Sequence, residues 1–118
     1  MKRLAVLLAL YTFAAASFAE CSSAVSSADD AYRYARRAYQ ESNFDDAQNY
    51  MRRSRNAADE GRSYAQNCSC PKAASFLDDA YTFARRGYNE SSLQALKSYS
   101  RKAMSAAEDG QNAASNCK

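Results

Sequence analysis

The chain is built from an internal duplication with a period of 49 residues. Residues 21–68 align without a gap with residues 70–117, and 21 of the 48 aligned pairs are identical. The segment ADDAYRYARRAYQES (28–42) matches LDDAYTFARRGYNES (77–91) most clearly. A chain of 118 residues has room for one small domain. We therefore expect one small structural unit that occurs twice.

Each repeat has the periodicity of two α-helices. Small residues recur at alternating spacings of four and three, which places them on one stripe of a helix. The stripe of the first helix consists of Ala24, Ala28, Ala31, Ala35 and Ala38. Segments 40–46 and 89–95 interrupt this pattern with Ser and Asn, which favour turns and helix caps. The repeats are therefore predicted to be two helical hairpins.

Local signals mark the helix ends. Asn43 is placed to cap the second helix, and Asp45 and Asp46 follow in its first turn, where carboxylates suit the helix dipole. Pro71, the only proline, fits the first turn of the third helix. The short segment before Pro71 is therefore predicted to join the two hairpins.

Residues 1–19 have the three-part order of a secretory signal peptide. A basic start precedes the apolar run Leu4–Ala16, and Ala19 stands before a cleavage point at Glu20. The run is too short for a membrane-spanning helix with a stop-transfer flank. We expect an exported protein, periplasmic or extracellular, with no membrane span after removal of the signal.

The chain after the signal is poor in large apolar side chains. It contains one Val, three Leu, three Phe and no Ile, but 19 Ala. Gly61 and Gly110 lie on the small-residue stripe, so the helices are predicted to continue through them with close approach of the backbones. Such a seam buries little area, at about 25 cal/mol per Å². Further stabilisation must come from the cysteines.

The four cysteines stand at the ends of the repeats, and they allow three pairings. The duplication favours Cys21–Cys68 and Cys70–Cys117, because each hairpin is then closed by itself. An export compartment permits such bonds. The alternative is a Cys-based metal or redox site around the C-x-C sequence of Cys68 and Cys70, although its spacing differs from that of structural zinc sites. No cofactor is expected.

The predicted fold is therefore all-α. It consists of two tandem disulfide-closed hairpins, over 20–69 and 70–118, which pack as one four-helix bundle or remain two loosely joined units.

Charge excludes a nucleic-acid partner. Two of the 16 basic residues belong to the signal, so the remaining chain carries 14 basic and 13 acidic residues and is nearly neutral. Basic pairs with tyrosines recur toward the turn end of both hairpins, and Arg and Tyr are enriched in binding surfaces. This candidate binding surface comprises Arg36, Arg37, Tyr39, Arg52, Arg53, Arg85, Arg86 and Tyr88, with Arg101 and Lys102 at matching places. The alternative is a solvated face beside tyrosines that cover the seam.

Catalysis is not expected. The chain has no His, and the repeated carboxylate pairs Asp29–Asp30 and Asp78–Asp79 fall on the predicted solvated side. We expect a small exported non-enzymatic protein with a structural or partner-binding role in the cell envelope or extracellular space, acting on a protein or glycan partner. The alternatives are a secreted effector or inhibitor, and a Cys-based metal- or redox-handling protein.

Overall fold

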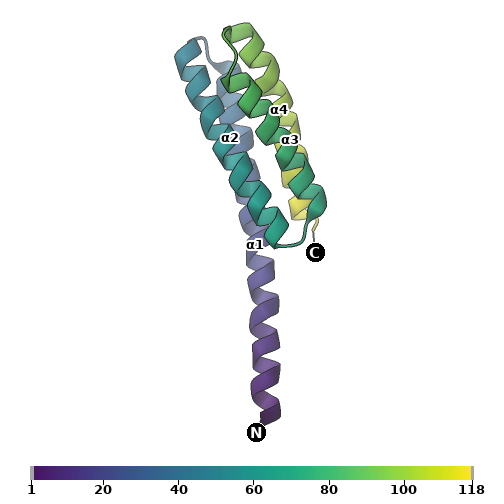
Figure 1. The fold of residues 1–118 in the computed structure, drawn as a ribbon. Helices are drawn as coiled ribbons and strands as arrows, with labels where there is room; N and C mark the ends of the chain where they lie inside the picture. Colours follow the sequence, from purple (N-terminus) through teal and green to yellow (C-terminus); the bar gives the residue numbers. More distant parts are fainter. Residues whose placement is uncertain (1, 118) are drawn as a thin grey trace.

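The computed structural model describes residues 2–117, with side chains from Cys21 onward. It contains four helices (Figure 1): α1 (Lys2–Gln40), α2 (Phe44–Asn67), α3 (Pro71–Tyr88) and α4 (Leu93–Ser115). No strand occurs in this part of the chain, as predicted. The predicted signal peptide over 1–19 lies outside the residues whose side chains are described.

The helices form one four-helix bundle. Each hairpin packs within itself, α1 on α2 and α3 on α4, and the hairpins pack on each other through α1 with α4 and α2 with α3. The diagonal helices barely touch. Of the two predicted arrangements, the single bundle is therefore the observed one. The α2–α3 joint and the C-terminus lie at one end of the bundle, and the two hairpin turns lie at the other (Figure 1).

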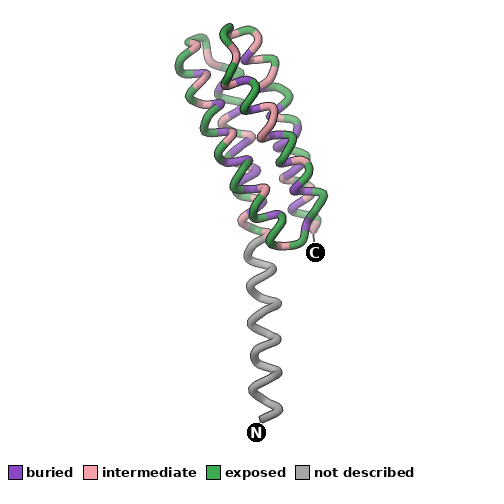
Figure 2. The backbone as a smooth tube through the Cα atoms, viewed as in Figure 1, coloured by how far each residue is buried: buried purple, intermediate pink, exposed green. Residues whose placement is uncertain are grey.

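The core is made largely of alanine. Buried positions follow the inner side of every helix (Figure 2), and they include all five alanines of the predicted α1 stripe. The only large side chains among the fully buried residues described are Met51, Leu77 and Leu96. An alanine interior allows the helices to approach closely, because few side chains hold them apart.

The glycines on the stripe lie inside helices, as predicted. A Cβ at Gly61 would lie 3.1 Å from Leu77 Cδ1 and 3.2 Å from Ser27 Cβ. These distances are shorter than ordinary van der Waals contact. The position is therefore filled by its neighbours and has little room for a side chain.

Equivalent side chains cap the second helix of each hairpin. The Asp46 N–H donates to Asn43 Oδ1 at 3.0 Å, and the Ala95 N–H donates to Ser92 Oγ at 3.2 Å. The predicted cap at Asn43 is confirmed. Because the capped helices begin at Phe44 and Leu93, the two turns are shorter than the predicted interruptions.

The joint between the hairpins is tightly hydrogen-bonded. The Cys70 N–H donates to Ala65 O at 2.8 Å and the Ser69 N–H donates to Gln66 O at 3.1 Å, which is the Schellman pattern of a helix C-terminus. Ser69 has a φ of 59°, the conformation that this motif requires. Pro71 is the first residue of α3, as predicted.

The disulfides follow the predicted pairing. Cys21 is bonded to Cys68 with a Cα–Cα distance of 5.3 Å, and Cys70 is bonded to Cys117 at 6.0 Å. All four cysteines are bonded, so none of them is a free thiolate that could bind a metal ion. Each hairpin is closed at the same end of the bundle.

Candidate functional site

The interior of the bundle offers little chemistry. Its buried polar side chains are three serines, Ser27, Ser54 and Ser100. Ser54 Oγ donates to Ala31 O at 2.8 Å, and Ser100 Oγ donates to Lys97 O at 2.8 Å. No buried side-chain nitrogen or oxygen among the described residues lacks a hydrogen-bond partner. The candidate sites considered below therefore lie on the surface.

Charged residues on that surface occur in pairs at a fixed spacing. Every helix carries a basic pair and an acidic pair seven residues apart, and α2 has a second acidic pair, Asp45 and Asp46, in its first turn. Seven residues are about two helical turns, so both pairs lie on the same face of their helix. Each pair also stands between two buried positions of the stripe, for example Arg36 and Arg37 between Ala35 and Ala38. The pairs therefore occupy the outermost side of each helix.

The pairs of one sign lie at the same level on all four helices. In α1 the acidic pair precedes the basic pair, and in the antiparallel α2 the order is reversed. The Cys21–Cys68 disulfide and the Ser54–Ala31 hydrogen bond set the register of these two helices. At 1.5 Å per residue, the basic pairs lie about 23 Å from the bonded cysteines and the acidic pairs about 13 Å.

The surface is thus encircled by two bands of opposite charge, about 10 Å apart. We call the first the basic belt: Arg36, Arg37, Arg52, Arg53, Arg85, Arg86, Arg101 and Lys102. We call the second the acidic belt: Asp29, Asp30, Asp59, Glu60, Asp78, Asp79, Glu108 and Asp109.

The belts are exposed and largely unpaired. All sixteen residues are exposed except Asp29, which is half-buried. Within residues 21–117 no residue of the basic belt forms an ion pair. In the acidic belt, Asp29 pairs with Arg33, and Asp59 and Asp78 pair with Arg62. Most of the belt charge is therefore available to a partner.

The sign of charge at the belt positions is the same in both repeats, although the repeats have diverged elsewhere. At all eight belt positions of the first repeat, the second repeat carries a residue of the same sign, including the changes from Arg53 to Lys102 and from Asp59 to Glu108. Of the six other charged positions in the first repeat, five are neutral in the second. Duplication alone would have copied both sets alike. The belts therefore behave as a feature that has been kept.

Aromatic rings lie beside the basic belt. The Arg53 guanidinium lies 5.9 Å from the centre of the Tyr34 ring, and the equivalent Lys102 ammonium lies 5.9 Å from Phe83. Lys102 also lies 5.4 Å from the Tyr99 ring. Such cation–π contacts hold the charged groups in place without neutralising them.

The structure brings six predicted site residues, all arginines, into the basic belt. The two predicted tyrosines lie nearer the turns and differ from each other. Tyr39 is 41% exposed, whereas Tyr88 is half-buried with the Arg55 guanidinium 5.0 Å from its ring centre. Tyr88 therefore contacts a cation outside the belt. A binding role for these residues stays a prediction.

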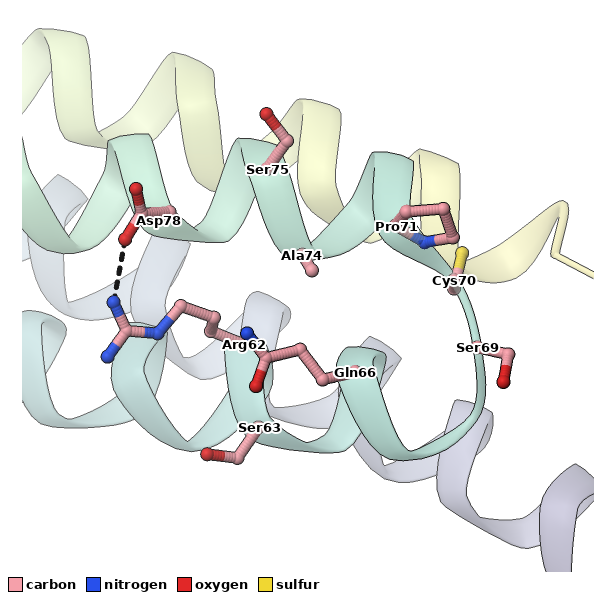
Figure 3. Close-up of a pocket in the computed structure, with 9 residues that line it drawn as sticks. All are labelled: Arg62, Ser63, Gln66, Ser69, Cys70, Pro71, Ala74, Ser75 and Asp78. Atoms are coloured by element: carbon pink, nitrogen blue, oxygen red, sulfur yellow. Dashed lines mark hydrogen bonds and ion pairs between the residues drawn. The ribbon is translucent and has the colours of Figure 1, made fainter.

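A hollow between α2 and α3 is the second candidate site (Figure 3). It extends from Arg62 and Asp78 to the joint at Ser69, Cys70 and Pro71. Arg62 Nη1 lies 2.6 Å from Asp78 Oδ1, and the guanidinium also bonds Asp59 and lies 5.0 Å from the Tyr81 ring. Hydrogen bonding to Asp78 raises the pKa of Arg62.

These contacts make Arg62 a clamp between α2 and α3, with its charge already neutralised. The clamp is specific to this side of the bundle. The position equivalent to Arg62 is Gln111, and the position equivalent to Arg33 is Thr82. As a result Asp29 pairs within its own helix, whereas Asp78 pairs across to Arg62. The hollow beside it is lined by Ser63, Ser69 and Ser75 among other residues.

Among the side chains of residues 21–117, no three His, Cys, Asp or Glu lie close enough together to hold a metal ion. No helix in that part of the chain is both long enough and apolar enough to cross a membrane.

The acidic belt is not predicted from the sequence. The pairs at 29–30 and 78–79 are expected on a solvated face, and no role is assigned to those at 59–60 and 108–109. The signal was present in the seven-residue spacing between pairs of opposite sign in every predicted helix. The order of the acidic and basic pairs reverses from one helix to the next. In antiparallel hairpins this reversal places pairs of the same sign at the same level.

No protein-family model, curated protein or solved structure matches the chain.

Proposed function

We propose that this chain is an exported, non-enzymatic protein with a structural or partner-binding role in the cell envelope or extracellular space, and that it acts through its two charged belts. The observation that carries this proposal is the retention of charge sign at every belt position while most other charged positions diverged between the repeats. Solvated charges without a partner are free to change, so retained ones indicate a contact.

The two disulfides support an oxidising, exported location. Each closes a loop with a sequence separation of 47 residues, which is worth about 4 kcal/mol in the chain-entropy model. Bonds of this kind persist outside reducing compartments. A small bundle with an alanine core depends on them strongly, because its apolar burial is modest.

The form of the surface favours binding over catalysis. Catalytic carboxylates acquire shifted pKa values through burial or close charged neighbours. The belt carboxylates are exposed and spread around the bundle. An extended charged surface of this kind instead gives specificity and fast association with a partner of complementary charge.

The spacing of the belts favours a protein partner. The belts are about 10 Å apart, slightly more than the screening length of about 8 Å at physiological salt. A partner therefore experiences two separate bands of opposite sign. Anionic glycans and nucleic acids present one sign of charge, so the acidic belt would repel them beside the basic one. A protein surface can match both belts.

The experiment is chemical cross-linking of the protein in its own compartment. A basic-belt variant with four neutralised cations, R52Q/R53Q/R101Q/K102Q, is compared with a control that loses the same charge outside the belts, R33Q/R55Q/K72Q/K97Q. We expect the cross-linked complexes of the native chain to persist in the control and to disappear in the belt variant. Equal complexes in both variants would refute the proposal.

Binding of an anionic glycan is a second candidate, supported by the aromatic rings beside the basic belt. Heparin serves as the probe. Retention of the native chain on a heparin column at physiological salt, and its loss in the basic-belt variant alone, would favour the glycan. Elution of the native chain without retention would favour a protein partner.

A further inference from the structure

We propose that the two belts join two copies of this chain, side by side and antiparallel. This inference rests on the proposed function, because it names a second copy of the chain as the partner of the belts. The observation behind it is that the belt pattern is complementary to itself. One belt carries eight cations and the other eight carboxylates, at equal distances on all four helices.

Only one orientation matches both belts. If two bundles lie parallel and level, each belt meets a belt of its own sign. If one bundle is shifted along the other by about 10 Å, one belt is matched and the other is left without a partner. A two-fold axis perpendicular to the bundle, midway between the belts, places each basic belt against the acidic belt of the other copy. This is the isologous arrangement of common dimers.

The axis also falls at the middle of the bundle. The midpoint between the belts is about 12 residues from the bonded cysteines, and α2 has 24 residues. Two copies therefore overlap along their full length when the belts are matched. The disulfide end of each copy then lies beside the hairpin turns of the other.

The charges at the two ends agree with this arrangement. The turn end carries four carboxylates near the hairpin turns, Glu41, Asp45, Asp46 and Glu90, against one cation, Lys97. The disulfide end carries Lys72 on an exposed position of α3. The antiparallel arrangement brings opposite charges together at the ends as well as at the belts.

Long-range repulsion between copies is small. Residues 20–118 carry 14 basic and 13 acidic residues, so the copies are almost neutral as a whole. Association therefore depends on the placement of charge and not on its sum. Exposed ion pairs are individually weak and are screened by salt, so the contact is expected to be reversible and strongly dependent on ionic strength.

Sedimentation velocity of the oxidised protein tests the association. We expect a dimer in about 0.01 M salt, where the screening length is about 30 Å, and a monomer in about 1 M salt, where it is about 3 Å. A monomer at both salt concentrations would overturn the inference. A dimer unaffected by salt would also overturn it, because the belts would not be its cause.

Two charge-swap variants separate the belts from other causes of association. The first reverses one exposed carboxylate on each helix, D30K/E60K/D79K/D109K. The second reverses one exposed cation on each helix, R36E/R52E/R86E/R101E. None of these residues forms an ion pair within residues 21–117.

Each swap variant alone is expected to be monomeric at low salt, because its two belts then have weakened or lost complementarity. An equimolar mixture of the two is expected to form heterodimers, which also demonstrates that both variants fold. Homodimers of either variant at the native level would overturn the inference. Folded variants that fail to associate when mixed would do so too.

Zero-length carbodiimide cross-linking distinguishes the orientations. Within one chain Lys72 lies about 30 Å along the bundle from Asp46 on the turn side, too far for direct bond formation. A cross-link between Lys72 and Asp45, Asp46 or Glu90 therefore joins two antiparallel copies. Cross-links from Lys72 only to carboxylates of the disulfide half would contradict the antiparallel arrangement.

Different experimental outcomes refute this inference and the proposed function. A chain that is monomeric in every sedimentation experiment, but whose native complexes still need the basic belt, has a different protein partner. If the native complexes are unaffected by neutralisation of the basic belt, the proposed function itself is wrong.

Discussion

Leu77 lies directly against the backbone of Gly110. A Cβ at Gly110 would stand 2.9 Å from Leu77 Cγ and 3.0 Å from Leu77 Cδ2. Real side chains do not approach so closely, and Cγ is a branch point that moves only with the whole side chain. The single large residue at this level of the core is therefore accommodated by the absence of a side chain on α4.

Gly110→Ala is accordingly expected to destabilise the bundle by about 1–2 kcal/mol, because overpacking outweighs the gain in helix propensity. The control is the same change in a Leu77→Ala background. There the clash is removed, and the alanine is expected to stabilise by up to about 1 kcal/mol. Urea unfolding of the four proteins measures both effects. An equal effect of Gly110→Ala in the two backgrounds would show that the Leu77 contact is not the cause.

Loss of one disulfide is expected to cost about 4 kcal/mol in the free energy of unfolding, because it releases a loop whose ends are 47 residues apart. The paired change Cys21→Ser with Cys68→Ser avoids a free thiol, and Cys70→Ser with Cys117→Ser is its matched counterpart in the second hairpin. Thermal and denaturant unfolding measure the loss. An unchanged melting temperature in either variant would mean that the corresponding bond does not stabilise the bundle.

Ser69→Gly is expected to stabilise the chain by up to about 1 kcal/mol. Ser69 has a φ of 59°, a conformation that costs a residue with a side chain about 1–2 kcal/mol and costs glycine little. Part of the gain is offset by the greater freedom of glycine in the unfolded chain. Ser63→Gly, in the interior of α2, is the control and should destabilise by about 1 kcal/mol. A loss of stability in Ser69→Gly would contradict the Schellman geometry of the joint.

Arg62→Gln, which introduces the residue found at the equivalent position 111, is expected to cost less than about 1 kcal/mol, because the clamp is partly exposed. A double-mutant cycle with Asp78→Asn should give a coupling of about 0.5 kcal/mol that decreases at high salt. Chemical denaturation at low and high salt measures it. Zero coupling at low salt would mean that the two helices are not held together by this pair.

The helices and the disulfides could be predicted from the sequence because their signals are local or duplicated. The alternating spacing of Ala24 to Ala38 indicates a helix face without reference to any other segment. The cysteine pairing followed from two equal repeats. The packing of the hairpins into one bundle could not be decided in this way, since both arrangements bury the same stripe.

The belts and the Arg62 clamp depend on contacts between helices. Asp59 and Asp30 are distant in sequence, and they fall at one level only when α1 and α2 run antiparallel in the observed register. Arg62 and Asp78 are 16 residues apart across the hairpin joint. No periodicity within a single helix indicates such a pair. Local patterns therefore predicted the elements and the residues of the basic belt, but not the arrangement that makes them a surface.

Export and oxidation of the chain underlie every role proposed for its belts. They are tested most directly by intact mass spectrometry, without reductant, of the protein purified from its own compartment. We predict a single species that begins at Glu20 and is about 4 Da lighter than its reduced form, as two disulfides require. A species that retains residues 1–19 or has four free thiols would contradict the account of an exported, disulfide-closed bundle.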